Sequence, residues 1–490
     1  MASEGQNHRL HIFFFPFPAH GHMIPTVDMA KLFAGRGVRA TIVTTPLNLP
    51  LISRSIQESI ALGLAINLVS IKFPCAEAGL PEGCENADAV SSYSMVPAFF
   101  EATTMLQEPL EQLLREHHPD CLIAGSFFPW ATDSATKFGI PRIVFHGTGF
   151  FPLCVSESIT AHQPFKDVVS DSDPFVIPNL PGVEIQMTRK ILPSFFMTDE
   201  DTFLTRMFKA AKQSVVKSFG VVVNSFYELE GIYADHYKKV LGRKAWHIGP
   251  VSLCNTDNKE KSYRGKQASM DAQDCLKWLD SKKPNSVLYI CFGSRSDFTE
   301  NQLREIAMGL EASGQNFIWV VRKSKKGNKE EGDGDQDEGW LPEGFEKRIE
   351  GKGLIIRGWA PQVLILDHEA TGGFVTHCGW NSTLEGVSAG VPMVTWPVSA
   401  EQFYNEKLIT EVLRIGVAVG VKKWVPVVGD YIEKEAVGKA VKAIMEGEEA
   451  EEMRNRAKKL ARMARETVEE GGSSYSDLNS LIEELADLSK

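Results

Sequence analysis

A run of hydrogen-bond donors follows the apolar segment Gly373–Thr376. His377, Asn381 and Ser382 stand there beside glycine, and Ser382–Val387 has a helical pattern. A loop that joins a strand to a helix presents free backbone N–H groups and the positive end of the helix dipole, which together bind anions. A diphosphate would be held there without a metal, and dipoles already in place would stabilise its charge when it leaves.

Two residues near this loop suit the other parts of a nucleotide. Glu385, one turn further along the same helix, can accept hydrogen bonds from two neighbouring hydroxyls of a ribose. Trp359 offers a flat apolar face on which a base can stack. Together with the donor-rich loop, they predict a site for a nucleoside diphosphate in the carboxyl-terminal half.

Two histidines stand near the other end of the chain. His20 and His22 lie in a loop predicted over Pro16–His22, directly after the first predicted strand. This places them at the carboxyl end of a sheet, where α/β proteins bind ligands. The pair resembles a metal-binding doublet, but no CxxC or HExxH pattern supplies further ligands, so no metal site is expected.

Apolar runs alternate with amphipathic stretches along the whole chain, which is typical of βαβ units and of a parallel sheet covered on both faces. The first helix is predicted over Ile24–Phe33, ended by Gly35 and Gly37. Strands are predicted in this half over Leu10–Phe15, Val38–Thr44, Cys121–Ala124, Arg142–Phe145 and Val221–Val223.

A second α/β half is predicted after a polar, charged stretch from Gly249 to about Gly265, which has the composition of an interdomain linker. Its strands are predicted over Ser286–Cys291, Asn316–Val321, Gly353–Ile356, Gly373–Thr376 and Pro392–Thr395, and its helices over Asn301–Ser313 and Glu451–Glu470. Two such halves suggest a ligand in the cleft between them.

Two regions do not fit this alternation. Lys323–Glu338 is so rich in charge and glycine that it is predicted to be a surface loop. Asp171–Phe196 carries several prolines and is either a lid over a pocket or a long connection.

Composition excludes several classes of protein. The chain has 490 residues and a formal net charge of −11, the wrong sign for a partner of nucleic acid. No apolar stretch approaches the roughly 18 residues that span a bilayer, and no signal peptide is recognised. The eight cysteines lack CxxC spacing, which favours reduced, buried thiols. We therefore expect a cytoplasmic protein without a membrane span.

One motif points to a different class of enzyme. Gly386–Gly390 has the GxSxG spacing of a hydrolase nucleophile elbow, which needs a strand before it and a helix after it. Here the predicted order is reversed, and the last histidine of the chain, His377, precedes Ser388. A hydrolase is not favoured.

The residues from Trp359 to Gln402 resemble the signature box of the plant family 1 UDP-dependent glycosyltransferases, with a likeness to family 73 in that group. The resemblance extends over nearly the whole chain, in segments such as GHMIPTVDMAKLF, FHGTGFF, PNLPG and CFGS. It implies an α/β chain with a GT-B fold, in which two Rossmann-like parallel-sheet domains face each other across a cleft. The implied parts are an acceptor-binding domain (1–249), a linker (250–266), a UDP-sugar-binding domain (267–465) and a helical tail that packs back toward the first domain (466–490).

The resemblance also implies a donor site with three tasks. Trp359 would stack on uracil, Ala360 would contact it through the backbone, and Gln362 and Glu385 would hold the ribose. The diphosphate would be bound by Ser294, His377, Asn381 and Ser382, and the sugar hydroxyls by Trp380, Glu401 and Gln402. Glutamine at the last position of the box resembles the users of glucose.

Within the segment GHMIP, His22 matches the catalytic histidine of the family, and the resemblance implies that it takes the proton of the acceptor hydroxyl. An imidazole with an ordinary pKa near 6.5 suits this task, which is typically worth about 10²–10⁴-fold in rate. One displacement inverts, so an α-linked donor gives a β-glucoside. His20, where relatives often carry glutamine, is expected to support His22 or, alternatively, to be the base itself.

The chain departs from the family at one catalytic position. The family usually couples its histidine to an aspartate just after a strand, and Gly125 stands at that position. In the serine-protease triad, replacing the aspartate that orients the histidine lowers kcat by about 10⁴. Three outcomes stay open: activity on acceptors that ionise easily, such as phenols; use of another group or a water; or a weak or inactive chain that still binds UDP-sugar.

The resemblance thus implies an inverting, UDP-glucose-dependent O-glucosyltransferase that acts on a small plant metabolite. The acceptor is expected to be a flavonoid or other phenolic, or a triterpenoid or steroidal sapogenin. No cofactor is expected besides UDP-glucose as co-substrate, and the chain is expected to be a monomer. The alternative is a non-catalytic UDP-sugar-binding protein. The expected acceptor pocket contains His20, Phe127, Phe128, His146, Thr148 and Phe196.

Overall fold

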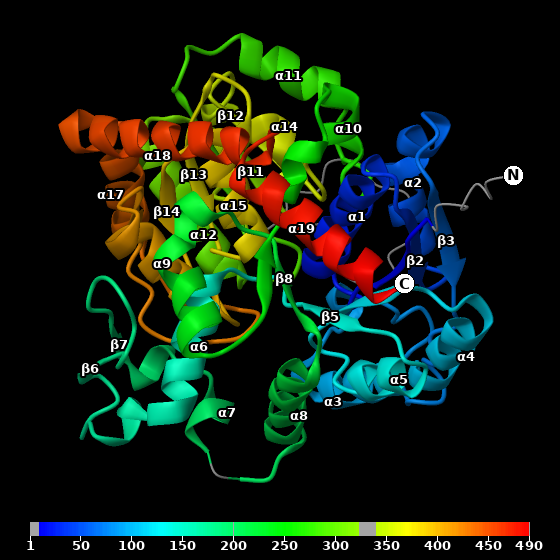
Figure 1. Cartoon of the computed structure of the whole chain (residues 1–490). Coiled ribbons are helices and arrows are strands. Elements are labelled where there is room, and N and C mark those ends of the chain that lie inside the picture. The colour runs from blue at the N-terminus through cyan, green and yellow to red at the C-terminus, as the bar shows by residue number, and fades with distance from the viewer. Residues whose placement is uncertain (1–8, 199, 323–339, 490) are drawn as a thin grey trace, which may run out of the picture. The chain divides into compact units, whose positions relative to one another are not determined.

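The computed structural model describes residues 9–198, 200–322 and 340–489 (Figure 1). The surface loop predicted over Lys323–Glu338 lies outside these residues. The chain forms two compact units. The first unit comprises the chain up to Phe150, Thr198–Gly265 and the residues from Glu466 onward, and the second comprises Phe151–Met197 and Lys266–Arg465.

The first unit contains a seven-stranded parallel sheet in the order β3-β2-β1-β4-β5-β8-β9. Its strands are β1 (His11–Phe15), β2 (Arg39–Thr44), β3 (Ile66–Ser70), β4 (Cys121–Gly125), β5 (Arg142–Phe145), β8 (Gly220–Val223) and β9 (Ala245–His247). All residues of β1 are buried. Ile12 and Phe14 enter one apolar cluster, and Phe13 and Phe15 enter another, so both faces of the sheet are covered.

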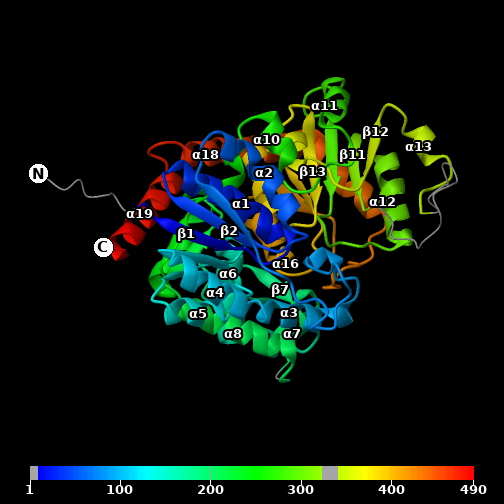
Figure 2. The ribbon, with the colours of Figure 1, turned by 90° about the vertical axis from the view of Figure 1, so that its right-hand side faces the viewer.

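Different helices cover the two faces of this sheet. The cluster with Ile12 and Phe14 includes residues of α1 (His20–Gly35), α2 (Leu49–Ala61) and α19 (Ser473–Leu488). The cluster with Phe13 and Phe15 includes residues of α3 (Val96–Thr104), α4 (Gln107–His117) and α5 (Ala131–Lys137), which lie together in Figures 1 and 2. The remaining helices of the unit are α8 (Phe203–Lys217), α9 (Tyr227–Asp235) and α10 (Asn258–Tyr263).

The second unit contains a six-stranded parallel sheet in the order β12-β11-β10-β13-β14-β15. Its strands are β10 (Val287–Cys291), β11 (Asn316–Val321), β12 (Gly353–Arg357), β13 (Thr371–Thr376), β14 (Met393–Thr395) and β15 (Gly416–Ala418). A separate antiparallel hairpin pairs β6 (Pro174–Val176) with β7 (Gln186–Thr188), inside the region predicted to be irregular.

Helices also accompany the strands of the second unit. They are α6 (Phe150–His162), α7 (Ser194–Met197), α11 (Ala272–Asp280), α12 (Glu300–Ser313), α13 (Phe345–Arg348), α14 (Gln362–Leu366), α15 (Trp380–Ala389), α16 (Gln402–Lys407), α17 (Lys434–Met445) and α18 (Gly447–Val468). Both α6 and α18 contain a residue at which the chain passes between the units.

The strands predicted from the sequence are confirmed, each within two residues at either end. Besides the two strands of the β6–β7 hairpin, the strands β3, β9 and β15 were not predicted; these three are edge strands of the two parallel sheets. Two of them, β9 and β15, have only three residues, and β3 carries the polar residues Asn67 and Ser70 among its five. None contains the apolar run by which a central parallel strand is recognised.

The loop predicted over Pro16–His22 is wrong at its carboxyl end, because α1 begins at His20. The carbonyl of Ala19 accepts from the backbone N–H groups of His22 and Met23. Pro25 lies inside this helix, which nevertheless continues to Gly35. Both histidines therefore lie in the first turn of a helix, where they are held more firmly than in a loop.

The stretch from Gly249 to Gly265 is polar, yet it packs against α1. Asn255 donates to Asp28 at 2.9 Å and accepts from Lys31 at 2.8 Å, and Arg264 forms an ion pair with Asp28 at 2.7 Å. Asp28 and Lys31 are buried. The polar residues of this stretch therefore form hydrogen bonds and an ion pair with buried charged residues of α1. Composition alone did not indicate these contacts.

The cysteines agree with the expectation of reduced, buried thiols. All eight cysteines are free, and most are buried. Within residues 9–198, 200–322 and 340–489, no helix combines the length and the apolarity needed to cross a membrane.

We predict that Leu481→Ala lowers the free energy of unfolding by about 2–5 kcal/mol, the usual cost of truncating a buried leucine. Leu481 is fully buried on α19, in the cluster that includes β1. Urea denaturation of the whole chain measures the change.

Leu488→Ala is the matched control, since Leu488 lies on the same helix and is 55% exposed. It should change stability by less than about 0.5 kcal/mol. Equal losses in the two variants would contradict the docking of α19 through Leu481.

Candidate functional site

The sheet of the second unit gathers the predicted donor residues at one edge. Ser294 follows β10, Trp359 follows β12, His377 follows β13 and Glu401 follows β14. These strands are parallel, so their carboxyl ends share one edge of the sheet. The structure thus brings together residues that are far apart in the sequence.

His377 is held between two glycines in the turn from β13 to α15. A Cβ added to Gly293 would lie 2.6 Å from the His377 ring, and one added to Gly379 would lie 2.5 Å from it. Burial lowers the pKa of His377 to about 4. The imidazole is therefore neutral at pH 7 and can donate one hydrogen bond without carrying charge.

The start of α15 lies next to His377. Gly379 is the N-cap of this ten-residue helix and has no side chain to satisfy its backbone N–H groups. Asn381 and Ser382 occupy the first turn. The positive end of the helix dipole and neutral side-chain donors therefore meet at this turn, as an anion site requires.

Gln362, Ser382 and Glu385 form a hydrogen-bonded group. The amide nitrogen of Gln362 donates to Ser382 Oγ at 3.0 Å and to Glu385 Oε2 at 2.6 Å. Ser382 and Glu385 are buried on α15, and Gln362 begins α14. Two helices are thereby joined through the side chains that the sequence analysis assigned to ribose and diphosphate.

The backbone around Trp359 is fixed by a serine from elsewhere in the second unit. Ser269 donates its backbone N–H to the carbonyl of Trp359 at 2.8 Å, and its Oγ accepts from the Trp359 N–H at 2.9 Å. The indole is partly exposed, and Ala360 is buried. Trp359 therefore has an accessible side chain on a fixed backbone, which suits stacking.

The three residues assigned to sugar hydroxyls also lie close to this turn or to the loop after β14. The Glu401 carboxylate accepts from the backbone N–H of Trp380, and burial raises the pKa of Glu401. Gln402 accepts through Oε1 from the N–H groups of Val398 and Ser399, at 2.8 Å each. The amide nitrogen of Gln402 remains as its donor.

In the first unit, His22 is surrounded by aromatic rings. Its ring centroid lies 5.6 Å from those of Phe17 and Phe127 and 6.4 Å from that of Phe145. Gly147, with φ of 76°, passes so close that an added Cβ would lie 2.9 Å from the imidazole. His22 is therefore positioned by packing from the loop after β1, from Phe127 and from the loop after β5.

The loop after β5 carries two further predicted residues, His146 and Thr148. Burial, together with the charges of Arg142, Arg243 and His22, lowers the pKa of His146 to about 3. In the described part of the chain, neither His146 Nε2 nor Thr148 Oγ1 has a hydrogen-bond partner. Both atoms can therefore form a hydrogen bond with a bound hydroxylated molecule.

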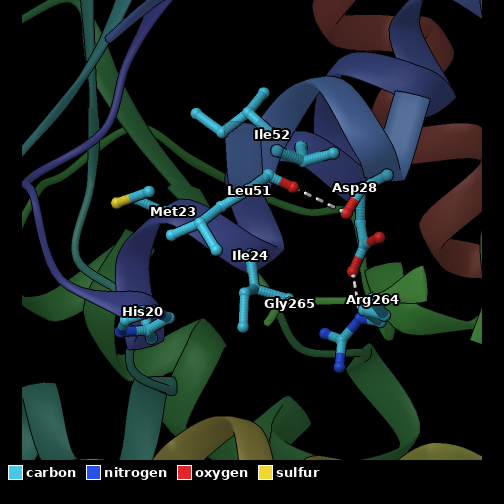
Figure 3. A pocket seen from close by; sticks show the side chains of 10 residues that line it. His20, Met23, Ile24, Asp28, Leu51, Ile52, Arg264 and Gly265 are labelled. Carbon is cyan, nitrogen blue, oxygen red and sulfur yellow. Dashed lines mark hydrogen bonds and ion pairs between the residues drawn. The ribbon is translucent and has the colours of Figure 1, made fainter. Parts of the chain in front are cut away.

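His20 has a carboxylate neighbour, since its Nδ1 lies 3.5 Å from Asp88 Oδ2. Two positions along a helix turn the side chain by about 200°, so His20 and His22 leave α1 in nearly opposite directions. His20 lines a pocket with the apolar side chains of Met23, Ile24 and Leu51, and Figure 3 shows the ion pair of Asp28 and Arg264 on the other side.

The two predicted phenylalanines after β4 have different surroundings. Phe127 touches His22, whereas Phe128 is fully buried and stacks on Phe15 with ring centroids 4.3 Å apart. Phe128 therefore belongs to the core. Phe196 lies in α7, in the second unit.

Several residues that hold these sites were not predicted. Ser269 and Asp88 lie far from their partners in the sequence and have no local signal. Gly293 stands in the segment CFGS, where a glycine just after a strand indicates a close approach. Among the described residues, no group of three or more His, Cys, Asp or Glu side chains could hold a metal.

Comparisons with known proteins agree with this architecture. The family model described as UDP-glucoronosyl and UDP-glucosyl transferase matches residues 202–463. Scopoletin glucosyltransferase of Nicotiana tabacum is 59% identical over 478 residues, 98% of this chain and 98% of that protein. UDP-glucose flavonoid 3-O-glucosyltransferase 7 of Fragaria ananassa is 57% identical over 498 residues, 100% of this chain and 99% of that protein.

A solved structure is similar along the same length. Glycyrrhiza uralensis UGT73P12 complexed with glycyrrhetinic acid 3-O-monoglucuronide matches with a TM-score of 0.89 and 42% identity, covering 98% of this chain and 96% of that one. The two parallel-sheet units and this match define a glycosyltransferase of the GT-B fold. The chain belongs to the plant family 1 UDP-dependent glycosyltransferases, in group 73 of that family.

We predict that Gly293→Ala moves the His377 imidazole out of its site, because the new methyl group and the ring cannot occupy the same space. The pKa of His377 should then rise from about 4 toward its ordinary value, since the ring becomes hydrated. NMR titration of the imidazole C–H signals measures this pKa, and His377→Gln identifies the signal.

Gly314→Ala is the control for backbone strain. Gly293 and Gly314 both have φ of 72°, but nothing lies within 4 Å of a Cβ at Gly314. The control should leave the pKa of His377 unchanged, and the same shift in both variants would contradict a role for the Gly293 contact.

Proposed function

We propose that this glycosyltransferase transfers glucose from UDP-glucose to a hydroxyl of a small plant secondary metabolite, with inversion at the anomeric carbon. The proposal rests on the hydrogen-bonded group of Gln362, Ser382 and Glu385. This group places an amide and a carboxylate, which can form hydrogen bonds with a ribose, beside the start of α15. The names of the tobacco and strawberry relatives, a scopoletin and a flavonoid glucosyltransferase, support glucose as the sugar and a phenolic acceptor.

In this proposal, the carboxyl edge of the second sheet binds the donor. Trp359 stacks on uracil beside Ala360, and Glu385 accepts from the ribose hydroxyls while Gln362 holds it in place. Among the described residues, Nδ1 of His377 has no hydrogen-bond partner. In this proposal, the ring of His377 binds the diphosphate. Ser294, Asn381 and Ser382 complete the diphosphate site, and Trp380, Glu401 and Gln402 contact the sugar.

His22 is the proposed base. It takes the proton from the acceptor hydroxyl, whose oxygen forms a bond to the anomeric carbon while the bond from that carbon to UDP breaks. The electron pair leaves with UDP, and the dipole of α15 and the neutral donors around it stabilise the departing charge without a metal. The ring contacts to Phe17 and Phe127 keep the imidazole in place.

The acceptor is proposed to be a flavonoid or other phenolic, or a triterpenoid or steroidal sapogenin. The rings near His22 suit a flat apolar molecule, and the polar atoms of His146 and Thr148 suit a second substituent on it. The sapogenin class rests on the triterpenoid glucuronide named for the similar solved structure.

A second candidate is a UDP-sugar-binding protein with little or no transferase activity. Gly125 favours it, since the position that the family fills with aspartate offers no carboxylate here.

Mass spectrometry separates the two candidates. The full chain, UDP-glucose and a panel of phenols, flavonoids and sapogenins should yield a product heavier than the acceptor by one hexose. Calorimetry should show UDP binding in the unmodified chain and at least about tenfold weaker binding in Trp359→Ala, which loses a stacked base. UDP binding without any product would support the second candidate, and no UDP binding would contradict both.

We predict that His22→Gln lowers kcat on unsubstituted phenol by about 10²–10⁴-fold, the range for a lost general base. The dissociation constant for UDP should not change, because the proposed donor residues belong to the second unit. His162→Gln, at an exposed histidine, is the control. Unchanged kcat in His22→Gln would remove this histidine from the mechanism.

A further inference from the structure

A residue with a strained backbone lies inside the turn from β13 to α15. Cys378 has φ of 62°, in the left-handed region that residues other than glycine rarely adopt. It is fully buried and stands between His377 and Gly379, the N-cap of α15. Such a conformation costs free energy and persists only where neighbouring groups hold it. The groups that hold Cys378 therefore determine how the chain enters α15.

A buried amide from α16 holds the Cys378 carbonyl. Asn405 is fully buried, and its Nδ2 donates to the carbonyl oxygen of Cys378 at 2.8 Å. The N–H of Cys378 donates to Thr376 Oγ1 at 3.2 Å. Both peptide groups of Cys378 are thus bonded, and the shorter of the two bonds comes from Asn405.

The bond from Asn405 also sets the direction of an N–H group at the start of α15. The trans peptide between Cys378 and Gly379 is planar, and its carbonyl and N–H point to opposite sides. Since the carbonyl points toward Asn405, the N–H of Gly379 points away from α16. The next peptide is held as well, because the Trp380 N–H donates to Glu401, whose Oε1 lies 3.5 Å from Asn405 Nδ2. Side chains of α16 and its N-cap therefore orient two consecutive peptide groups at this helix start.

The amide of Asn405 stabilises the core less than an apolar side chain of the same shape would. In the described part of the chain, its Oδ1 is buried and has no hydrogen-bond partner. An unpaired buried acceptor costs free energy, which an apolar group avoids. The favourable contribution of the amide is therefore its bond at Nδ2, and this bond acts on the turn that carries His377.

We propose that Asn405 is a positioning residue of the donor site, whose bond to Cys378 keeps the left-handed turn that places His377 beside the first N–H groups of α15. This inference rests on the donor site proposed above and adds to it a residue outside the segment from Trp359 to Gln402. Because Asn405 is fully buried, it acts through the backbone and does not itself contact the nucleotide.

The test is the affinity of Asn405→Leu for UDP, measured by calorimetry on the full chain. Leucine has nearly the same shape as asparagine but cannot donate, so the turn should lose its left-handed conformation in part. The dissociation constant for UDP should then rise about tenfold, the effect of one lost hydrogen bond.

The stability of Asn405→Leu separates positioning from a merely structural role. The midpoint of urea denaturation should change little, because the variant loses one unpaired buried acceptor, Oδ1, and gains another, the carbonyl of Cys378. A loss of stability with unchanged affinity for UDP would overturn the inference.

Asn316→Leu is the matched control. Asn316 begins β11, and its Nδ2 donates to the carbonyl of Ser286, which precedes β10, at 3.3 Å. The control therefore removes the same kind of bond at the amino edge of the same sheet, opposite to the edge that gathers the proposed donor residues. It should bind UDP as tightly as the unmodified chain. A loss of affinity equal to that of Asn405→Leu would overturn the inference.

A double-mutant cycle tests whether Asn405 acts through Cys378. Glycine adopts the left-handed conformation at no steric cost, so with Cys378→Gly the turn should depend less on the bond from α16. In that background, Asn405→Leu should raise the dissociation constant for UDP by about threefold or less. The cavity left by the buried thiol is present on both sides of this comparison. Equal losses in the two backgrounds would overturn the inference.

If Asn405→Leu does not fold, Asn405→Ala removes the same bond with a side chain too small to clash. Unchanged affinity for UDP in that variant would overturn the positioning role and leave the proposed function standing. If the unmodified chain itself does not bind UDP, the proposed donor site is wrong, and this inference fails with it.

Discussion

Parallel pairing in the second sheet is the constraint on which the proposed donor site depends. Because β10, β12, β13 and β14 run in one direction, the loops that follow them share one edge of the sheet. The register is held by buried side chains, with Phe374 paired to Tyr289 on one side and to Met393 on the other. A slip of β13 against either neighbour would move His377 and the start of α15 relative to Ser294 and Glu401. The apolar strands therefore determine the positions of polar residues that they do not contain.

This dependence explains which features the sequence could predict. Central strands have continuous apolar runs, and the ten predicted strands are present, whereas the edge strands β3, β9 and β15 are short or half polar. The motif around His377 indicated a strand, a turn and a helix in order, and that order is found. The partners Ser269 of Trp359 and Asp88 of His20 could not be predicted, because their contacts depend on tertiary packing. The early start of α1 was missed because glycine and proline in the first turns obscured its pattern.

Burial keeps an imidazole neutral in each unit, at His377 and at His146. At His377, glycines on both sides let the backbone approach the ring closely, so small residues in and near the turn allow the ring to pack there. A neutral imidazole can donate to a phosphate oxygen without the strong attraction of a full positive charge. An anion held by dipoles and neutral donors would be attracted less strongly than one held by arginines. Glutamine, serine and asparagine lie beside this histidine at the same edge of the sheet.

At Gly125, a close backbone contact and a buried cation lie side by side. A Cβ at this position would lie 3.1 Å from the Phe17 nitrogen and 3.3 Å from the Phe17 Cβ, so β4 and the loop after β1 are closer than a larger residue would comfortably allow. The same residue's carbonyl accepts from Arg142, which ties the end of β4 to a buried cation. An aspartate at this position would supply negative charge, but the neighbouring backbone would have to move by a few tenths of an ångström to receive it. The neighbouring strand ends therefore determine how much space surrounds the His22 imidazole.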